Sequence, residues 1–152
     1  MGDVSRRAVL GAAAWSVPAL SLAVASPAAA ASGGGEPQLW WDRSAVASGE
    51  TATLLLQLPA PHEPFPDSAA VFVFPAGRVG DWNIRPVTSS WPPDAAHEYP
   101  YLAWRSNGLA QPGALAVFEI AFRRITDGSS AVFVPRFSAG GAAIEGPSMV
   151  AQ

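Results

Sequence analysis

The chain has 152 residues, a net charge of −3 and 49% hydrophobic residues, and it contains neither cysteine nor lysine. The lack of cysteine excludes disulfides and lipid attachment through a thiol. The lack of lysine excludes Schiff-base catalysis, a Walker-type phosphate lysine and lysine–asparagine isopeptide links. Because nucleic acids and anionic membranes bind clustered cations, this acidic chain without basic clusters predicts no nucleic-acid partner.

The N-terminus has the three parts of an export signal. Arg6 and Arg7 come first, and a mildly hydrophobic run from Ala8 to Ala25 follows. Small residues suited to a signal peptidase then continue to Ala31. The apolar run is at or below the ~20 residues that a membrane-spanning helix needs. It therefore favours a cleaved signal over a permanent anchor.

The arginine pair resembles the twin-arginine (Tat) signal pattern Ser-Arg-Arg-x-Phe-Leu-Lys. Ser5, Arg6, Arg7 and Leu10 match that pattern, and Val9 stands where phenylalanine is commonest. The resemblance implies that the Tat export machinery and a signal peptidase act on the chain, which would touch the membrane only through its signal before cleavage. The mature protein would be secreted and extracellular, either released or associated with the cell wall. An ordinary Sec signal that carries two arginines is the alternative.

Cleavage near Ala31 would leave about 120 residues, which is the size of one domain with a single core. The mature part would carry seven arginines and eleven carboxylates, a net charge of −4. We expect a signal peptide over 1–31, a flexible glycine-rich spacer over 32–36 and one domain over 37–152.

Beyond the spacer, short alternating runs are separated by proline, glycine and aspartate, which predicts β-strands. In the run Thr51–Leu58, for example, Leu54, Leu56 and Leu58 share one face. The expected strands are Pro37–Asp42, Thr51–Leu58, Ala69–Phe74, Trp82–Val87, Tyr99–Arg105, Ala114–Ile125, Ser130–Ser138 and a short one between Ala142 and Val150.

The run Ala114–Ile125 is the longest expected strand. Its better core face holds Ala116, Phe118, Ile120, Phe122 and Arg124. The pair Asp127-Gly128 that follows indicates a hairpin into the next strand.

Two segments resemble parts of bacterial immunoglobulin-like extracellular domains. Leu109-Ala110-Gln111-Pro112-Gly113 is similar to their "Leu-x-Pro-Gly" lead-in to a strand, and Ala47–Thr53 is similar to the start of their second strand. With its export signal, the chain resembles small Tat-exported immunoglobulin-like proteins of Gram-positive bacteria, many of them uncharacterised. The resemblance and the turn-separated strands predict an antiparallel, immunoglobulin-like β-sandwich of about seven strands. A jelly roll or another open sandwich is the alternative.

Aromatic residues are the strongest functional lead. Trp40 and Trp41 are adjacent, so on a strand they point to opposite faces and one should face outward. Trp91 lies beside prolines in a loop and is expected to be partly exposed. The hypothesis is that an aromatic surface binds cell-wall glycan, and the alternative is that the rings fill the core. The ligand-binding candidates are Trp41, Trp91, Tyr99 and Trp104.

The two histidines, His62 and His97, lie in proline-rich loops and each precedes a glutamate. If the loops meet, they form a candidate metal site for zinc or copper. The alternative is two solvated histidines. No Gly-x-Ser-x-Gly elbow or recognisable Ser–His–Asp context is present.

We therefore predict a secreted or cell-envelope domain with a non-enzymatic binding or structural role and no cofactor. Its partner would be cell-wall glycan or another envelope protein, the latter through an exposed sheet edge. The alternative function is a metal- or carboxylate-dependent secreted enzyme that uses His62 and His97.

Overall fold

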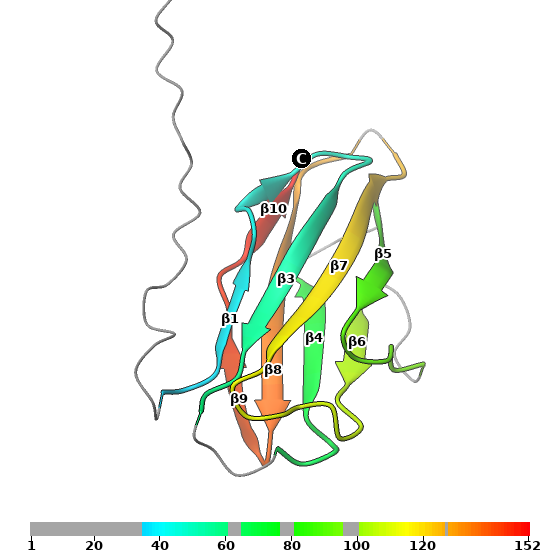
Figure 1. Ribbon diagram of the computed structural model, residues 1–152. Coiled ribbons are helices and arrows are strands. Elements are labelled where there is room, and N and C mark those ends of the chain that lie inside the picture. The colour runs from blue at the N-terminus through cyan, green and yellow to red at the C-terminus, as the bar shows by residue number, and fades with distance from the viewer. Residues whose placement is uncertain (1–34, 61–64, 77–80, 96–100, 127) are drawn as a thin grey trace, which may run out of the picture.

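The computed structural model describes residues 35–60, 65–76, 81–95, 101–126 and 128–152. These residues form two facing β-sheets (Figure 1), and none of them belongs to a helix that is long and apolar enough to cross a membrane. The strands are β1 (Gln38–Trp41), β2 (Ala45–Val46), β3 (Thr51–Gln57), β4 (Ala70–Pro75), β5 (Trp82–Ser89), β6 (Leu102–Arg105), β7 (Leu115–Arg124), β8 (Ala131–Ala139), β9 (Ala142–Glu145) and β10 (Met149–Ala151).

One sheet has four strands in the order β1-β3-β7-β5, and the other has six, β2-β10-β8-β4-β6 with β9 beside β8. β2 and β10 are parallel. When β2, β6 and β9 are set aside, seven strands remain in the order of an immunoglobulin constant-type sandwich. In one sheet β1, β3, β7 and β5 correspond to its strands A, B, E and D, and in the other β4, β8 and β10 correspond to its strands C, F and G. The predicted immunoglobulin-like β-sandwich is confirmed.

The hairpin predicted at Asp127-Gly128 is wrong. β7 and β8 lie in different sheets, so the chain crosses from one layer to the other between them, and Asp127 itself lies outside the described residues. The two-residue hairpin turn instead joins β8 to β9 at Gly140 and Gly141, with φ angles of 58° and 85°. Positive φ at both central residues is what a type I′ turn requires, and glycine adopts it without strain.

The C-terminal region also departs from the expected single strand between Ala142 and Val150. It forms β9 and β10, which pair with different parts of β8 and are separated by Gly146, Pro147 and Ser148. The prolyl residue has no N–H to donate to a sheet, so a strand is interrupted there. β2 was not predicted, because two residues are too short to show alternation.

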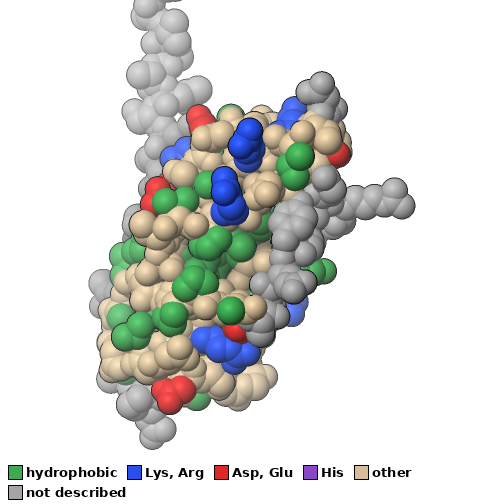
Figure 2. All heavy atoms as spheres, turned by 90° about the vertical axis from the view of Figure 1, so that its right-hand side faces the viewer, with side chains coloured by type: hydrophobic (Ala, Val, Ile, Leu, Met, Phe, Trp, Pro, Cys, Tyr) green, Lys and Arg blue, Asp and Glu red, His purple; other side chains and the backbone are tan. Residues whose placement is uncertain are grey.

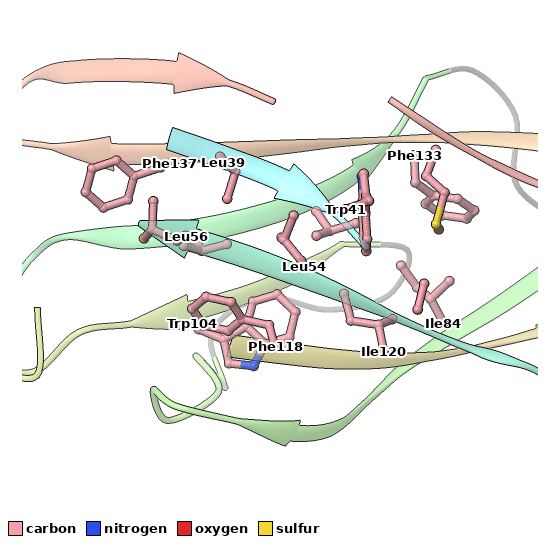
Figure 3. Packing of buried hydrophobic residues seen from close by; sticks show 14 of the residues in the cluster. Leu39, Trp41, Leu54, Leu56, Ile84, Trp104, Phe118, Ile120, Phe133 and Phe137 are labelled. Carbon is pink, nitrogen blue, oxygen red and sulfur yellow. The ribbon is translucent and has the colours of Figure 1, made fainter. Parts of the chain in front are cut away.

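The core lies between the sheets, and Figure 3 shows aliphatic and aromatic side chains from both layers meeting there. As the alternation predicted, Leu54 and Leu56 of β3 and Phe118 and Ile120 of β7 are fully buried. Aromatic edges join the layers: Phe122 of β7 and Phe133 of β8 have ring centroids 5.3 Å apart in a T-shaped arrangement. Such pairs contribute about 0.5–1.5 kcal/mol beyond the burial of their area.

Candidate ligand-binding site

The expected exposure of Trp91 is wrong, because this residue is only 2% exposed. Its ring centroid lies 5.5 Å from that of Phe118 in one sheet and 6.4 Å from that of Phe137 in the other. The loop that carries Trp91 is held against β6, where the backbone N–H of Asp94 donates to the carbonyl of Ala103 over 2.8 Å. These contacts place the indole between the sheets rather than in solvent.

The other two described tryptophans of the hypothesis are also buried. Trp41 points inward, with its ring centroid 6.1 Å from that of Phe122, while Trp40 is partly exposed on the opposite face, as adjacent strand positions require. Trp104 is fully buried against Phe118, with ring centroids 5.0 Å apart. Because no face of these three buried rings is open to a ligand, an aromatic surface cannot be built from them.

Several predicted residues lie outside the described part of the chain: Arg6, Arg7, Leu10, His62, His97 and Tyr99. Within the described part, no group of three or more His, Asp or Glu residues is placed to hold a metal ion. The metal site at the histidine loops stays a prediction, which calorimetric titration of zinc and copper into the protein would test. Binding tighter than about 10 μM, lost in His62→Ala and His97→Ala, is the expected result if the loops form a site of ordinary protein affinity. Millimolar or weaker binding would contradict the prediction of a metal site.

A different set of aromatic side chains covers the outer face of the six-stranded sheet. Along β4, Val71 and Val73 point into the core, whereas Phe72 and Phe74 point outward and remain partly exposed. Tyr101, which immediately precedes β6, is 50% exposed on the same side of the sheet. The alternation of β4 therefore presents aromatic rings to solvent in place of the expected tryptophans.

These rings belong to a surface hollow of about 390 Å³, which we call the aromatic groove. Three neighbouring strands and the residue before a fourth supply its lining. The lining residues are Phe72, Phe74, Tyr101, Arg136, Ser138 and Ala143. A hollow of this size is within the range of small-ligand pockets, which combine apolar walls with a few polar groups.

Arg136 provides the fixed charge in the groove. It pairs across the sheet with Glu145 of β9, to which its Nε donates over 3.2 Å and its Nη2 also donates. The guanidinium carbon lies 5.1 Å from the centroid of the Phe74 ring, in a cation–π contact. The ion pair and the ring orient the guanidinium, so that donors and acceptors lie next to the aromatic walls.

A second charged pair lies on the β6 side of the same sheet. Arg105, the register partner of Ala70 in β4, donates from Nε to Asp94 Oδ2 over 2.6 Å. The Asp94 side chain is largely buried and that of Arg105 is half exposed. The outer face of this sheet therefore has apolar rings flanked by two oriented ion pairs.

No protein-family model matches the sequence, and the search of curated proteins finds no relative. Three solved structures are similar at low identity. The C-terminal domain of the AgI/II polypeptide BspA of Streptococcus agalactiae is 10% identical, with a TM-score of 0.44, over 71% of this chain and 44% of that one. A non-cellulosomal cohesin of Archaeoglobus fulgidus is 13% identical, with a TM-score of 0.44, over 78% and 92%. An uncharacterised Nocardia farcinica protein with an immunoglobulin-like fold is 13% identical, with a TM-score of 0.39, over 74% and 95%.

The chain thus spans less than half of the streptococcal structure. Likeness at these identities concerns the fold alone, because one sandwich architecture serves many unrelated functions. The function of this chain therefore has to be inferred from the residues on its own surface.

Proposed function

We propose that this protein is an exported, non-enzymatic binding domain that holds a glycan of the cell envelope in the aromatic groove. Export rests on the signal pattern at the N-terminus, including Arg6 and Arg7. The observation that carries the binding role is the gathering of Phe72, Phe74 and Tyr101 beside Arg136 on an outer sheet face.

The chemistry of the groove fits a sugar ring. A pyranose presents apolar C–H groups on its faces and hydroxyls on its rim, so it matches aromatic walls edged by donors and acceptors. In the groove, the ring of Tyr101 would stack on the sugar, and Ser138, Arg136 and Glu145 would meet its hydroxyls. Arg136 is already neutralised by Glu145, which favours an uncharged glycan over an acidic one.

The test is retention of the full chain on insoluble polysaccharides, namely cellulose, chitin and purified cell-wall glycan. Replacing Tyr101 by alanine should reduce retention on at least one of them about ten-fold, which corresponds to about 1.4 kcal/mol of lost stacking energy. The matched control is Trp40→Ala, which removes a partly exposed aromatic ring from the outer face of the other sheet.

The Trp40→Ala control should be retained on the glycan as strongly as the unchanged protein. If retention is lost in Trp40→Ala and kept in Tyr101→Ala, the ligand binds the four-stranded sheet and the aromatic groove is not its site. If no polysaccharide retains the unchanged protein, the glycan proposal fails and a protein partner becomes the leading hypothesis.

A further inference from the structure

A second hollow, of about 340 Å³, lies far from the aromatic groove, next to the end of β7. Its lining consists of Ser48, Arg124, Ile125 and Thr126. Ser48 also lies next to the C-terminal residue, because its backbone N–H donates to the carbonyl of Gln152 over 3.2 Å. In Figure 1 this is the upper end of the molecule, where the C-terminus is marked.

The side chain of Arg124 packs on an aromatic ring at this hollow. It stands opposite Trp82 in the register of β7 with β5, and its guanidinium carbon lies 5.1 Å from the centroid of the Trp82 ring. The indole is itself fixed, since Trp82 Nε1 donates to the carbonyl of Ser129 over 3.0 Å. The backbone N–H of Arg124 donates to Ser48 Oγ over 2.9 Å. Pre-organisation of this kind lowers the entropic cost of binding a ligand.

The guanidinium of Arg124 lacks an anionic partner among the described residues. The described ion pairs use Arg43, Arg105 and Arg136 instead. The Nε atom of Arg124 is buried and has no hydrogen-bond acceptor in the described structure. A ligand in the hollow would therefore meet the Nη atoms of Arg124, which also have no anionic partner among the described residues.

The other polar groups define where an anion would sit. The hydroxyl of Thr126 donates to Asp81 Oδ1, so its hydrogen is already used and a carboxylate lies on that side. The hydroxyl of Ser48 accepts from the backbone, which leaves its own hydrogen free to donate. Arg124 and Ser48 can therefore donate together to one oxyanion, on the side of the hollow away from Asp81.

From this geometry we propose that the Arg124 hollow binds the carboxylate group of a small organic acid. A planar, singly charged group with two oxygens matches the two Nη atoms of arginine, which bind carboxylates end-on through two parallel hydrogen bonds. A phosphate dianion fits less well, because it would bring a second negative charge towards Asp81. On the neighbouring side of the molecule, arginine side chains are interspersed with acidic and hydrophobic ones (Figure 2), so selectivity for an anion would come from Arg124 and Ser48 themselves.

The test follows the arginine Nε–Hε signals of the full chain by nuclear magnetic resonance. Sodium acetate is added at ionic strength matched with sodium chloride, and sodium phosphate is the second probe. The expected result is a saturable shift of the Arg124 signal with acetate, with a dissociation constant on the order of 10 mM or lower. Equal, unsaturated shifts with all three salts, or saturation with phosphate alone, would overturn the proposal.

Two variants separate the site from general electrostatics. Arg124→Lys keeps the positive charge but loses the planar fork, and should raise the acetate dissociation constant at least five-fold, read from the backbone signal of Ser48. Arg123→Gln removes the neighbouring exposed charge on the opposite face of β7. This variant should change the acetate dissociation constant less than two-fold. A lysine variant that binds as tightly as the unchanged protein, or a glutamine control that loses binding equally, would show that no such site exists.

Discussion

Replacing Trp104 by alanine is expected to lower the free energy of unfolding by about 3–5 kcal/mol. The residue is fully buried, packs on Phe118 with ring centroids 5.0 Å apart and faces its register partner Val71. The loss is large because the surrounding strands cannot collapse into the space that the indole leaves. It would consume much of the 5–15 kcal/mol that typically stabilises a domain. Denaturant unfolding followed by circular dichroism measures the change.

Two further variants show that the effect comes from burial of the ring. Trp40→Ala removes a partly exposed indole and should cost less than about 1.5 kcal/mol. Trp104→Phe keeps an aromatic ring and removes the Nε1–H group, which is buried without an acceptor in the described structure, so it should be clearly more stable than the alanine variant. Equal destabilisation by Trp40→Ala and Trp104→Ala would contradict the described core.

Gly146→Ala is expected to destabilise the protein by about 1–3 kcal/mol, although it adds only one methyl group. A Cβ atom at this position would lie 2.6 Å from the carbonyl oxygen of Leu39 in β1 and 3.0 Å from Cγ of Pro135 in β8. The backbone N–H of Gly146 also donates to the Pro135 carbonyl over 3.0 Å, so the segment cannot simply move away. Thermal unfolding of the variant measures the loss.

Gly35→Ala is the matched control for this substitution. An added Cβ at Gly35 would meet no atom within 4 Å, and its backbone does not need the left-handed region. Its midpoint of thermal unfolding should stay within about 1 °C of the unchanged protein, because surface changes away from such contacts alter stability little. A Gly146→Ala variant as stable as Gly35→Ala would mean that Gly146 does not pack against Leu39 and Pro135 as described.

Alternation carried most of the fold prediction. Buried apolar residues recur at every second position, as Ala52, Leu54 and Leu56 in β3 and as Ala116, Phe118, Ile120 and Phe122 in β7. A two-residue period buries one face of a strand without reference to the rest of the chain. The same signal is too weak for β2, which has two residues. Alternation also cannot show whether consecutive strands belong to one sheet. For this reason it did not distinguish the crossing between layers after β7 from a hairpin.

The candidate site was predicted less well, because exposure depends on neighbours that are distant in sequence. The loop position of Trp91 indicated solvent, yet Phe118 and Phe137 enclose its ring from the two sheets. In β4 both faces are apolar, so alternation separates Phe72 from Val71 without indicating which of them points outward. The charged partner in the groove, Arg136, joins the aromatic rings only through the pairing of β8 with β4.

By itself, the sequence determined that this protein is a cysteine-free β-domain, because composition and the alternation of side chains act locally along each strand. Only the tertiary structure decided which aromatic rings face solvent and which of the described arginines has a buried Nε without an acceptor. Both properties depend on strand order and register, which bring together residues dozens of positions apart, such as Phe74 with Arg136 and Ser48 with Arg124.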